Sequence, residues 1–151
     1  MVQVCVGFGA NLGDAKGAVL QAITDVGGLA STQLLKASAL YTSAPVEATG
    51  PEFINAVALY NTDLQPLDLL DALQRLENEA GRERLYFHAP RTLDLDMIWY
   101  GDLMLSSPRL TLPHPRWQQR AFVLVPLAEI CPELVKTHWL EQVSAQEIAR
   151  L

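Results

Sequence analysis

Basic residues are scarce in this sequence, which has 11 Lys and Arg against 17 Asp and Glu and a formal net charge of −6. Proteins that bind nucleic acid through bulk charge are usually basic, so we expect no nucleic-acid partner. The sequence also has only two cysteines. Cys5 and Cys131 lie far apart, and no basic N-terminal segment marks a secretory signal, so we expect a reduced, cytoplasmic protein. No apolar run approaches membrane-spanning length, and we expect no membrane partner.

A phosphate-binding loop is also missing from the first glycine-rich turn, residues 7–14. This turn lacks the lysine of a GxxxxGK[ST] loop, and its glycine spacing does not fit GxGxxG. We therefore interpret it as a structural strand-to-helix turn with Asp14 as the helix N-cap. The length of 151 residues predicts one domain, 1–151, and we expect a monomer.

Hydrophobic periodicity divides the chain into alternating strands and helices. We expect strands over residues 2–8, 33–41, 53–61 and within 90–98, and helices over 15–27 and 66–81. Later elements are a short strand at 103–105, a helical region at 117–131, and a terminal helix opened by a capping box at 144–147. Pro126 predicts either a kink in the helical region or two short helices. The order β-α-β-β-α-β predicts an α+β fold with a ferredoxin-like core, in which helices flank a mainly antiparallel sheet.

Two carboxylates lie two residues apart at Asp94 and Asp96, inside an apolar run. Side chains alternate between the faces of a strand, so both aspartates should share one face while Leu93, Leu95 and Met97 point into a core. Neighbouring acids repel each other and lose hydration. A hard divalent cation with oxygen ligands would offset both penalties, so the pair predicts a metal site.

Arginines gather around this pair. Seven of the eleven basic residues lie in one 46-residue window: Arg75, Arg82, Arg84, Arg91, Arg109, Arg116 and Arg120. Arginine suits forked recognition of phosphate oxygens, and acids that hold a cation beside such arginines are the parts of a phosphoryl-transfer site. We expect Arg75 and Arg116 to lie in ordinary surface ion pairs instead.

Other interpretations stay open at this point. Two acids at this spacing also occur by chance on solvated strands, and another magnesium-dependent nucleotide transferase or a non-catalytic binding module would fit the pair as well. Asn55 is polar among the apolar residues of 53–61, which indicates either an edge position facing water or an amide aimed at a heterocycle. The loops 42–52 and 82–90 are long enough to suggest a functional role.

The segment Ala89-Pro90-Arg91-Thr92-Leu93-Asp94-Leu95-Asp96 resembles the signature of the 6-hydroxymethyl-7,8-dihydropterin pyrophosphokinase family. The resemblance runs from about residue 4 to 135 and includes Gly9-Ala10-Asn11-Leu12-Gly13, Phe53-Ile54-Asn55-Ala56, Leu112-Pro113-His114 and Arg120-Ala121-Phe122; residues 136–151 are not covered. It implies an enzyme of folate biosynthesis that transfers pyrophosphate from ATP to the pterin hydroxymethyl group and releases AMP.

The resemblance also implies roles for individual residues. Asp94 and Asp96 would bind two Mg²⁺ ions, and Arg82 and Arg91 would neutralise the phosphate chain as further catalytic residues. The positions matching ATP contacts are Gln74, Glu77, Arg84, Arg109, Thr111, His114 and Arg120. Those matching pterin contacts are Ser43, Val46, Phe53, Asn55 and Phe122, with the ring stacked between the two phenylalanines.

This sequence departs from the family pattern at a few places. His88 stands where the family often has tryptophan, and Leu85 and Phe87 stand near a usual basic residue. Pro115 replaces a frequent aromatic beside His114, and Ala10 replaces a usual serine. These departures concern contacts of the 82–90 loop and of the ATP side, and they leave the two aspartates intact.

Overall fold

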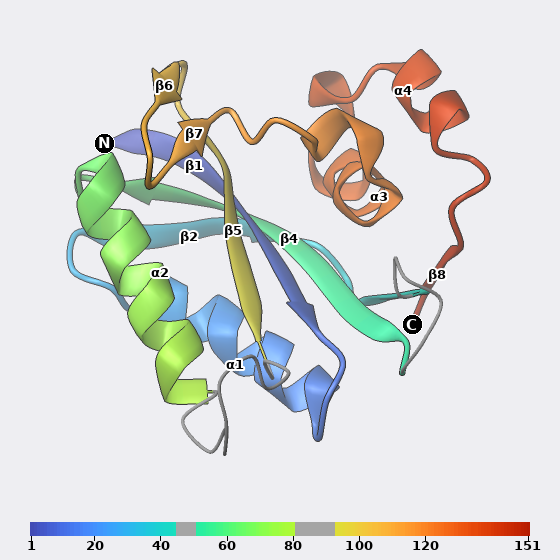
Figure 1. The fold of residues 1–151 in the computed structure, drawn as a ribbon, viewed down its shortest axis with the longest axis horizontal. Helices are drawn as coiled ribbons and strands as arrows, with labels where there is room; N and C mark the ends of the chain where they lie inside the picture. Colours follow the sequence, from blue (N-terminus) through green and yellow to red (C-terminus); the bar gives the residue numbers. More distant parts are fainter. Residues whose placement is uncertain (45–50, 81–92) are drawn as a thin grey trace.

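The computed structural model describes residues 1–44, 51–80 and 93–151, and shows a sheet with helices on both faces (Figure 1). Six strands form this sheet: β1 (Val2–Ala10), β2 (Thr32–Ala37), β3 (Tyr41–Ser43), β4 (Phe53–Thr62), β5 (Asp94–Tyr100) and β8 (Ile148–Arg150). Their order is β5-β1-β4-β3-β8, β2 also pairs with β4, and these pairings are antiparallel. The expected antiparallel sheet with flanking helices is therefore confirmed.

Helices α1 (Ala15–Gly27) and α2 (Pro66–Ala80) cover one face of the sheet, where they enclose the larger core. Asp14 caps α1 as expected, because its Oδ1 accepts a 3.0 Å hydrogen bond from the Gly17 N–H. Helix α3 (Ala121–Ile130) covers the other face, where Val123 and Leu127 form a second core with residues of β1, β4 and β5. The helices thus lie on opposite sides of the sheet (Figure 1).

The predicted strand 33–41 is wrong as one element, because the chain is split into β2 and β3. Between them, the Ser38 hydroxyl accepts a 3.0 Å bond from the Val57 N–H and breaks the regular ladder. The predicted strand at 103–105 is displaced. The structure instead has strand β6 (Leu105–Ser106), which follows the turn at Gly101 and pairs with β7 (Thr111–Leu112) in a two-stranded sheet.

The region after residue 116 also differs from its prediction. The region 117–131 contains a short 3₁₀ helix, η1 (Trp117–Gln119), and then α3 with Pro126 inside it. A second 3₁₀ helix, η2 (Pro132–Leu134), leads to α4 (Thr137–Gln142). The capping box at 144–147 opens no helix; these residues form a turn that leads into β8, so the helix prediction there is wrong. A capping pattern is a local signal, and strand pairing with β3 overrides it.

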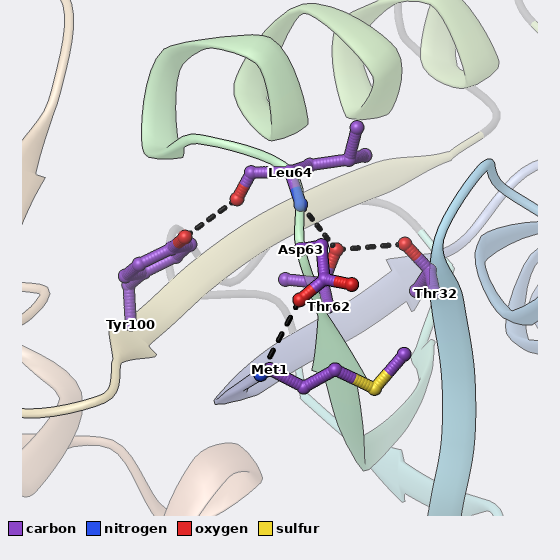
Figure 2. Close-up of polar contacts among 6 residues, drawn as sticks. All are labelled: Met1, Thr32, Thr62, Asp63, Leu64 and Tyr100. Carbon is purple, nitrogen blue, oxygen red and sulfur yellow. Dashed lines mark hydrogen bonds and ion pairs between the residues drawn. The ribbon is translucent and has the colours of Figure 1, made fainter.

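Polar groups tie the end of the sheet remote from Asp94 to the start of α2 (Figure 2). The Thr62 hydroxyl bonds with that of Thr32 at 2.8 Å and accepts the Leu64 N–H at 3.1 Å. Tyr100 donates its hydroxyl to the Leu64 carbonyl at 2.5 Å. This network fixes the turn between β4 and α2.

No helix among the described residues is long and apolar enough to cross a membrane.

Candidate active site

A cavity of about 200 Å³ opens on the α3 face of the sheet. Strands β1, β3, β4 and β5 and the start of α3 surround it. Its lining includes seven residues that the sequence singled out: Ser43, Phe53, Asn55, Asp94, Asp96, Arg120 and Phe122. These residues come from four separate parts of the chain, and the fold brings them to one place.

Asp94 and Asp96 lie on β5 as predicted. Leu93, Leu95 and Met97 are each at most 6% exposed and belong to the core under α1 and α2, while both aspartates line the cavity on the opposite face. Strand alternation alone therefore predicted this arrangement correctly. Glu77 of α2 supports the same strand, because its Oε2 accepts a 2.8 Å bond from the Leu95 N–H, between the two aspartates.

Two glycines form the floor of the cavity. In the pairing of β1 with β5, Gly9 lies opposite Asp94 and Gly7 opposite Asp96. In the pairing of β1 with β4, Gly9 also lies opposite Asn55. A Cβ on Gly9 would stand 3.3 Å from the Asn55 Nδ2, so any side chain there would intrude between the acids and the amide. Sequence reasoning treated this stretch as a structural turn and missed these residues.

Asn55 is only 4% exposed, so the alternative of an edge residue facing water is wrong. The Ser43 hydroxyl donates a hydrogen bond to its Oδ1 across the β3–β4 pair. Because the Oδ1 accepts from Ser43, the Asn55 amide nitrogen is the group that can donate hydrogen bonds into the cavity. This nitrogen lies close to Gly9. A buried amide held in one orientation can discriminate between hydrogen-bonding edges of a ligand.

Arg120 and Phe122 form the wall that α3 contributes. The Arg120 guanidinium carbon lies 5.4 Å from the centroid of the Phe122 ring. This cation–π contact brings a positive charge and an aromatic face together at the cavity. The site therefore has acids on β5, a buried amide on β4, and an arginine with an aromatic ring on α3.

His114 lies beside this charged group, although it does not line the cavity. Partial burial lowers the pKa of His114 from its ordinary value; the charges of Arg120 and Arg116 lower it too, while Asp96 raises it. Its Nδ1 accepts a 3.1 Å bond from the Arg116 N–H, so the proton of the neutral ring sits on Nε2. The imidazole is thus a hydrogen-bond donor at neutral pH.

Other predicted residues lie away from the cavity lining. Arg109 forms an ion pair with Asp71 and donates a 3.4 Å bond to the Gln74 Oε1, which links β7 and its preceding turn to α2. Thr111 is exposed on β7. Val46, Arg82, Arg84 and Arg91 fall outside the described residues, as do Leu85, Phe87 and His88.

The donor set fits a hard cation that also takes oxygen from a ligand. Among residues 1–44, 51–80 and 93–151 no group of three or more His, Cys, Asp or Glu side chains gathers at a metal-binding distance. Magnesium is commonly held by one or two carboxylates with substrate phosphates and water completing its octahedron. Two aspartates at the wall of a cavity therefore suit magnesium bound together with a phosphate ligand.

Known proteins resemble this chain in sequence. The family model described as 7,8-dihydro-6-hydroxymethylpterin-pyrophosphokinase (HPPK) matches residues 5–132. A 2-amino-4-hydroxy-6-hydroxymethyldihydropteridine pyrophosphokinase of Pseudomonas aeruginosa is 46% identical over 136 residues, covering 89% of this chain and 84% of that protein. One of the same name from Haemophilus influenzae is 42% identical, with 89% and 85% covered.

A solved structure is similar in fold. The crystal structure of an HPPK-DHPS in complex with substrates superposes with a TM-score of 0.71 at 10% identity, covering 95% of this chain and 43% of that one. This chain thus spans less than half of the HPPK-DHPS chain, and at that identity the likeness concerns the fold alone. The family model and the two bacterial relatives decide the family: the chain belongs to the 7,8-dihydro-6-hydroxymethylpterin-pyrophosphokinase family.

Proposed function

We propose that this protein transfers pyrophosphate from ATP to the hydroxymethyl group of 6-hydroxymethyl-7,8-dihydropterin, in folate biosynthesis. The match of residues 5–132 to the family carries this proposal. In the reaction the pterin hydroxyl oxygen forms a bond to the β-phosphorus and loses its proton. The bond from that phosphorus to the oxygen shared with the α-phosphate breaks, and AMP leaves.

Asp94 and Asp96 are the residues that would hold magnesium, and we propose two ions. Bound magnesium would neutralise the phosphate oxygens and lower the pKa of the attacking hydroxyl. Both carboxylates line the cavity beside Arg120, so the protein presents negative charge for the cation and positive charge for the phosphates within one space. Leu93, Leu95 and Met97 anchor the opposite side of β5 in the core, which restrains the aspartates.

The pterin ring would lie between Phe53 and Phe122, the predicted stacking pair, since both residues line the cavity. Asn55 would read the polar edge of the ring, because Ser43 fixes its amide orientation. We retain Val46 as a predicted pterin contact. The hydroxymethyl group would then point toward Asp94 and Asp96 on β5.

We assign ATP to the side of the site that faces α2 and β7. Gln74 and Glu77 lie on α2, and Arg109 and Thr111 lie at or just before β7. Arg120 lines the cavity, and its charge acts on His114. Arg84 stays a predicted contact. The Nε2–H of neutral His114 can donate to a phosphate oxygen without adding charge. We retain Arg82 and Arg91 as the predicted arginines on the phosphate chain.

Several broader features belong to the same proposal. The strand order β5-β1-β4, continued by β2 and β3, supports a ferredoxin-like core. Contacts of α4 and η1 with α3, and of β8 with β3, support one domain over residues 1–151. We also predict a monomeric protein in the cytoplasm, with ATP and the pterin as its small-molecule partners.

The proposed function is tested by incubating the protein with ATP, magnesium and the hydroxymethyl dihydropterin, and by identifying the products. We expect AMP and the pterin diphosphate in equal amounts. ADP or free pyrophosphate as the main product would favour another nucleotide transferase. Pterin binding without magnesium-dependent turnover would favour a binding module.

A further inference from the structure

We propose that Gln146, in the segment beyond the family match, is a positioning residue that holds Arg120 and Phe122 in place at the cavity. The proposal rests on the function proposed above and adds a residue to it. Gln146 lies 25 residues after Ala121 in sequence, in the turn between α4 and β8. Its side chain reaches back to the segment that enters α3.

The Gln146 amide makes two hydrogen bonds, one on each side of Arg120. Its Oε1 accepts the Ala121 N–H at 2.9 Å, and its Nε2 donates to the Gln119 carbonyl at 2.9 Å. A primary amide is the side-chain group that can accept from one backbone group and donate to a neighbouring one in this way. The two bonds fix the peptide groups on either side of Arg120.

The start of α3 needs such support. Arg120 is the N-cap residue, with extended backbone at φ −122° and ψ 115°, and its side chain makes no capping bond within the described part of the chain. An arginine side chain carries donors and no acceptor, so it cannot satisfy the free N–H groups of the first turn. Gln146 supplies the missing acceptor from a distant turn, and Arg120 is left to extend over Phe122.

The turn that carries Gln146 is itself anchored on both sides. After it, β8 pairs with β3 in the register Ser43 with Ile148 and Tyr41 with Arg150. Before it, Val143 is 4% exposed and packs with Ala121 and Leu124 of α3. A second hollow of about 430 Å³, lined by Ser43, Arg120, Phe122 and Gln146 among others, lies beside the cavity. Gln146 thus stands where the β3 and α3 walls of the site meet.

The test compares Gln146→Met and Gln146→Ala with wild type and with Gln118→Ala as a control. Methionine keeps the length and volume of glutamine and removes both hydrogen bonds, whereas Gln118 is exposed on η1 beside a different hollow. Steady-state release of AMP gives kcat and the pterin KM, and circular dichroism gives the folded fraction and Tm. Both Gln146 variants should raise the pterin KM about fivefold and lower kcat/KM about tenfold, with Gln118→Ala within twofold of wild type.

Any of four outcomes would overturn the proposal. Rescue by methionine would show that Gln146 acts through volume. A lower kcat with unchanged KM would show only a loss of folded enzyme. Values within twofold for both variants would show no role.

If Gln146→Met does not fold, Gln146→Glu carries the test, since it keeps the acceptor for Ala121 and loses the donor to Gln119. An unchanged KM for Gln146→Glu would also overturn the proposal. Absence of AMP formation by wild type would instead refute the proposed function.

Discussion

On the face of the sheet under α3, the same strands build a core at one end and a cavity at the other. At the closed end, Cys5, Val57 and Leu59 are each at most 1% exposed and pack against α3. At the open end, β1 carries Gly7 and Gly9, and β5 carries aspartates. The pairing of β1 with β4 continues through both ends, whereas the pairing of β1 with β5 shifts its register between Cys5 and Val6. Side-chain size and polarity, together with this irregularity, separate the core from the site.

The strand pairs at the open end build the site from regular backbone, since the register of β1 with β5 shifts only between Cys5 and Val6. The cavity floor is regular strand, held on its other side by α1 and α2. The acids, the amide and the glycines inherit their spacing from the register of β4, β1 and β5. Four changes would break or sharpen the contrast between the two ends.

The largest effect is expected from Asp94→Asn or Asp96→Asn at the open end. Each change removes a carboxylate that we assign to magnesium, so turnover should fall by about a thousandfold, with a far smaller change in pterin affinity. Initial rates of AMP release and equilibrium pterin titration measure the two quantities. Asp102→Asn, in the exposed turn after β5, is the matched control. Wild-type turnover in either site variant would refute the metal role.

Leu127→Ala at the closed end should change stability and leave the site intact. Leu127 is 0% exposed and belongs to the same core cluster as Val57 and Leu59, so its truncation leaves a cavity and lowers the free energy of unfolding by about 3 kcal/mol. Urea denaturation measures the loss, and Leu20→Ala, at a leucine that is 48% exposed, should change it by less than about 0.5 kcal/mol. A large rise in the pterin KM with unchanged stability would show that the two ends are not separate.

Gly9→Ala should fill part of the cavity where β1 forms its floor. The new Cβ would lie 3.3 Å from the Asn55 Nδ2, so pterin affinity should fall about tenfold, or about 1.4 kcal/mol. Gly7→Ala should have a smaller effect, since its Cβ would meet Ile98 at an ordinary 3.4 Å. Equilibrium titration with the pterin ranks the two variants. Equal affinities of wild type and Gly9→Ala would show that the ligand does not approach β1.

The smallest effect concerns the tie between the two walls. Tyr41 of β3 donates its hydroxyl to Glu129 of α3 at 2.6 Å, and burial, together with the bond to Glu129 and its charge, raises the pKa of Tyr41 to about 12. Between pH 10 and 12 the unfolded chain loses this proton first, so the tyrosine's stabilising contribution is full below pH 10 and falls as pH rises.

Tyr41→Phe should therefore lower the free energy of unfolding by about 1 kcal/mol at pH 8 and make it less dependent on pH above 10. Urea denaturation between pH 8 and 11 measures both. The difference between wild type and variant isolates Tyr41, because Tyr60 and Tyr100 also have raised pKa values and titrate in both proteins. A constant difference across this range would argue against the bond to Glu129.

Local periodicity predicted what depends on a single element. The shared face of Asp94 and Asp96, the cap at Asp14 and the span of α1 follow from alternation and capping rules, and the structure agrees. The role of Gly7 and Gly9 depends on which residues lie opposite them in β4 and β5. No local sequence pattern predicts the pairing register of strands that lie so far apart in the sequence.

The same reason explains the errors. The hydroxyl of Ser38 interrupts a segment with strand-like alternation by bonding to β4. The capping box at 144–147 gives way to pairing with β3, and the Gln146 inside it bonds to the start of α3 instead. Each outcome was decided by a partner distant in sequence.

Strand β8 has a consequence for how molecules of this protein meet one another. Without β8, the outer edge of β3 would present free N–H and C=O groups, which are a template for strand addition and aggregation. The pairing of residues 41–43 with 148–150, extended by the 2.9 Å bond from the Leu151 N–H to the Leu40 carbonyl, occupies that edge with the chain's own end. Residues 148–150 thus cover the β3 edge, at which copies of this protein could otherwise add a strand.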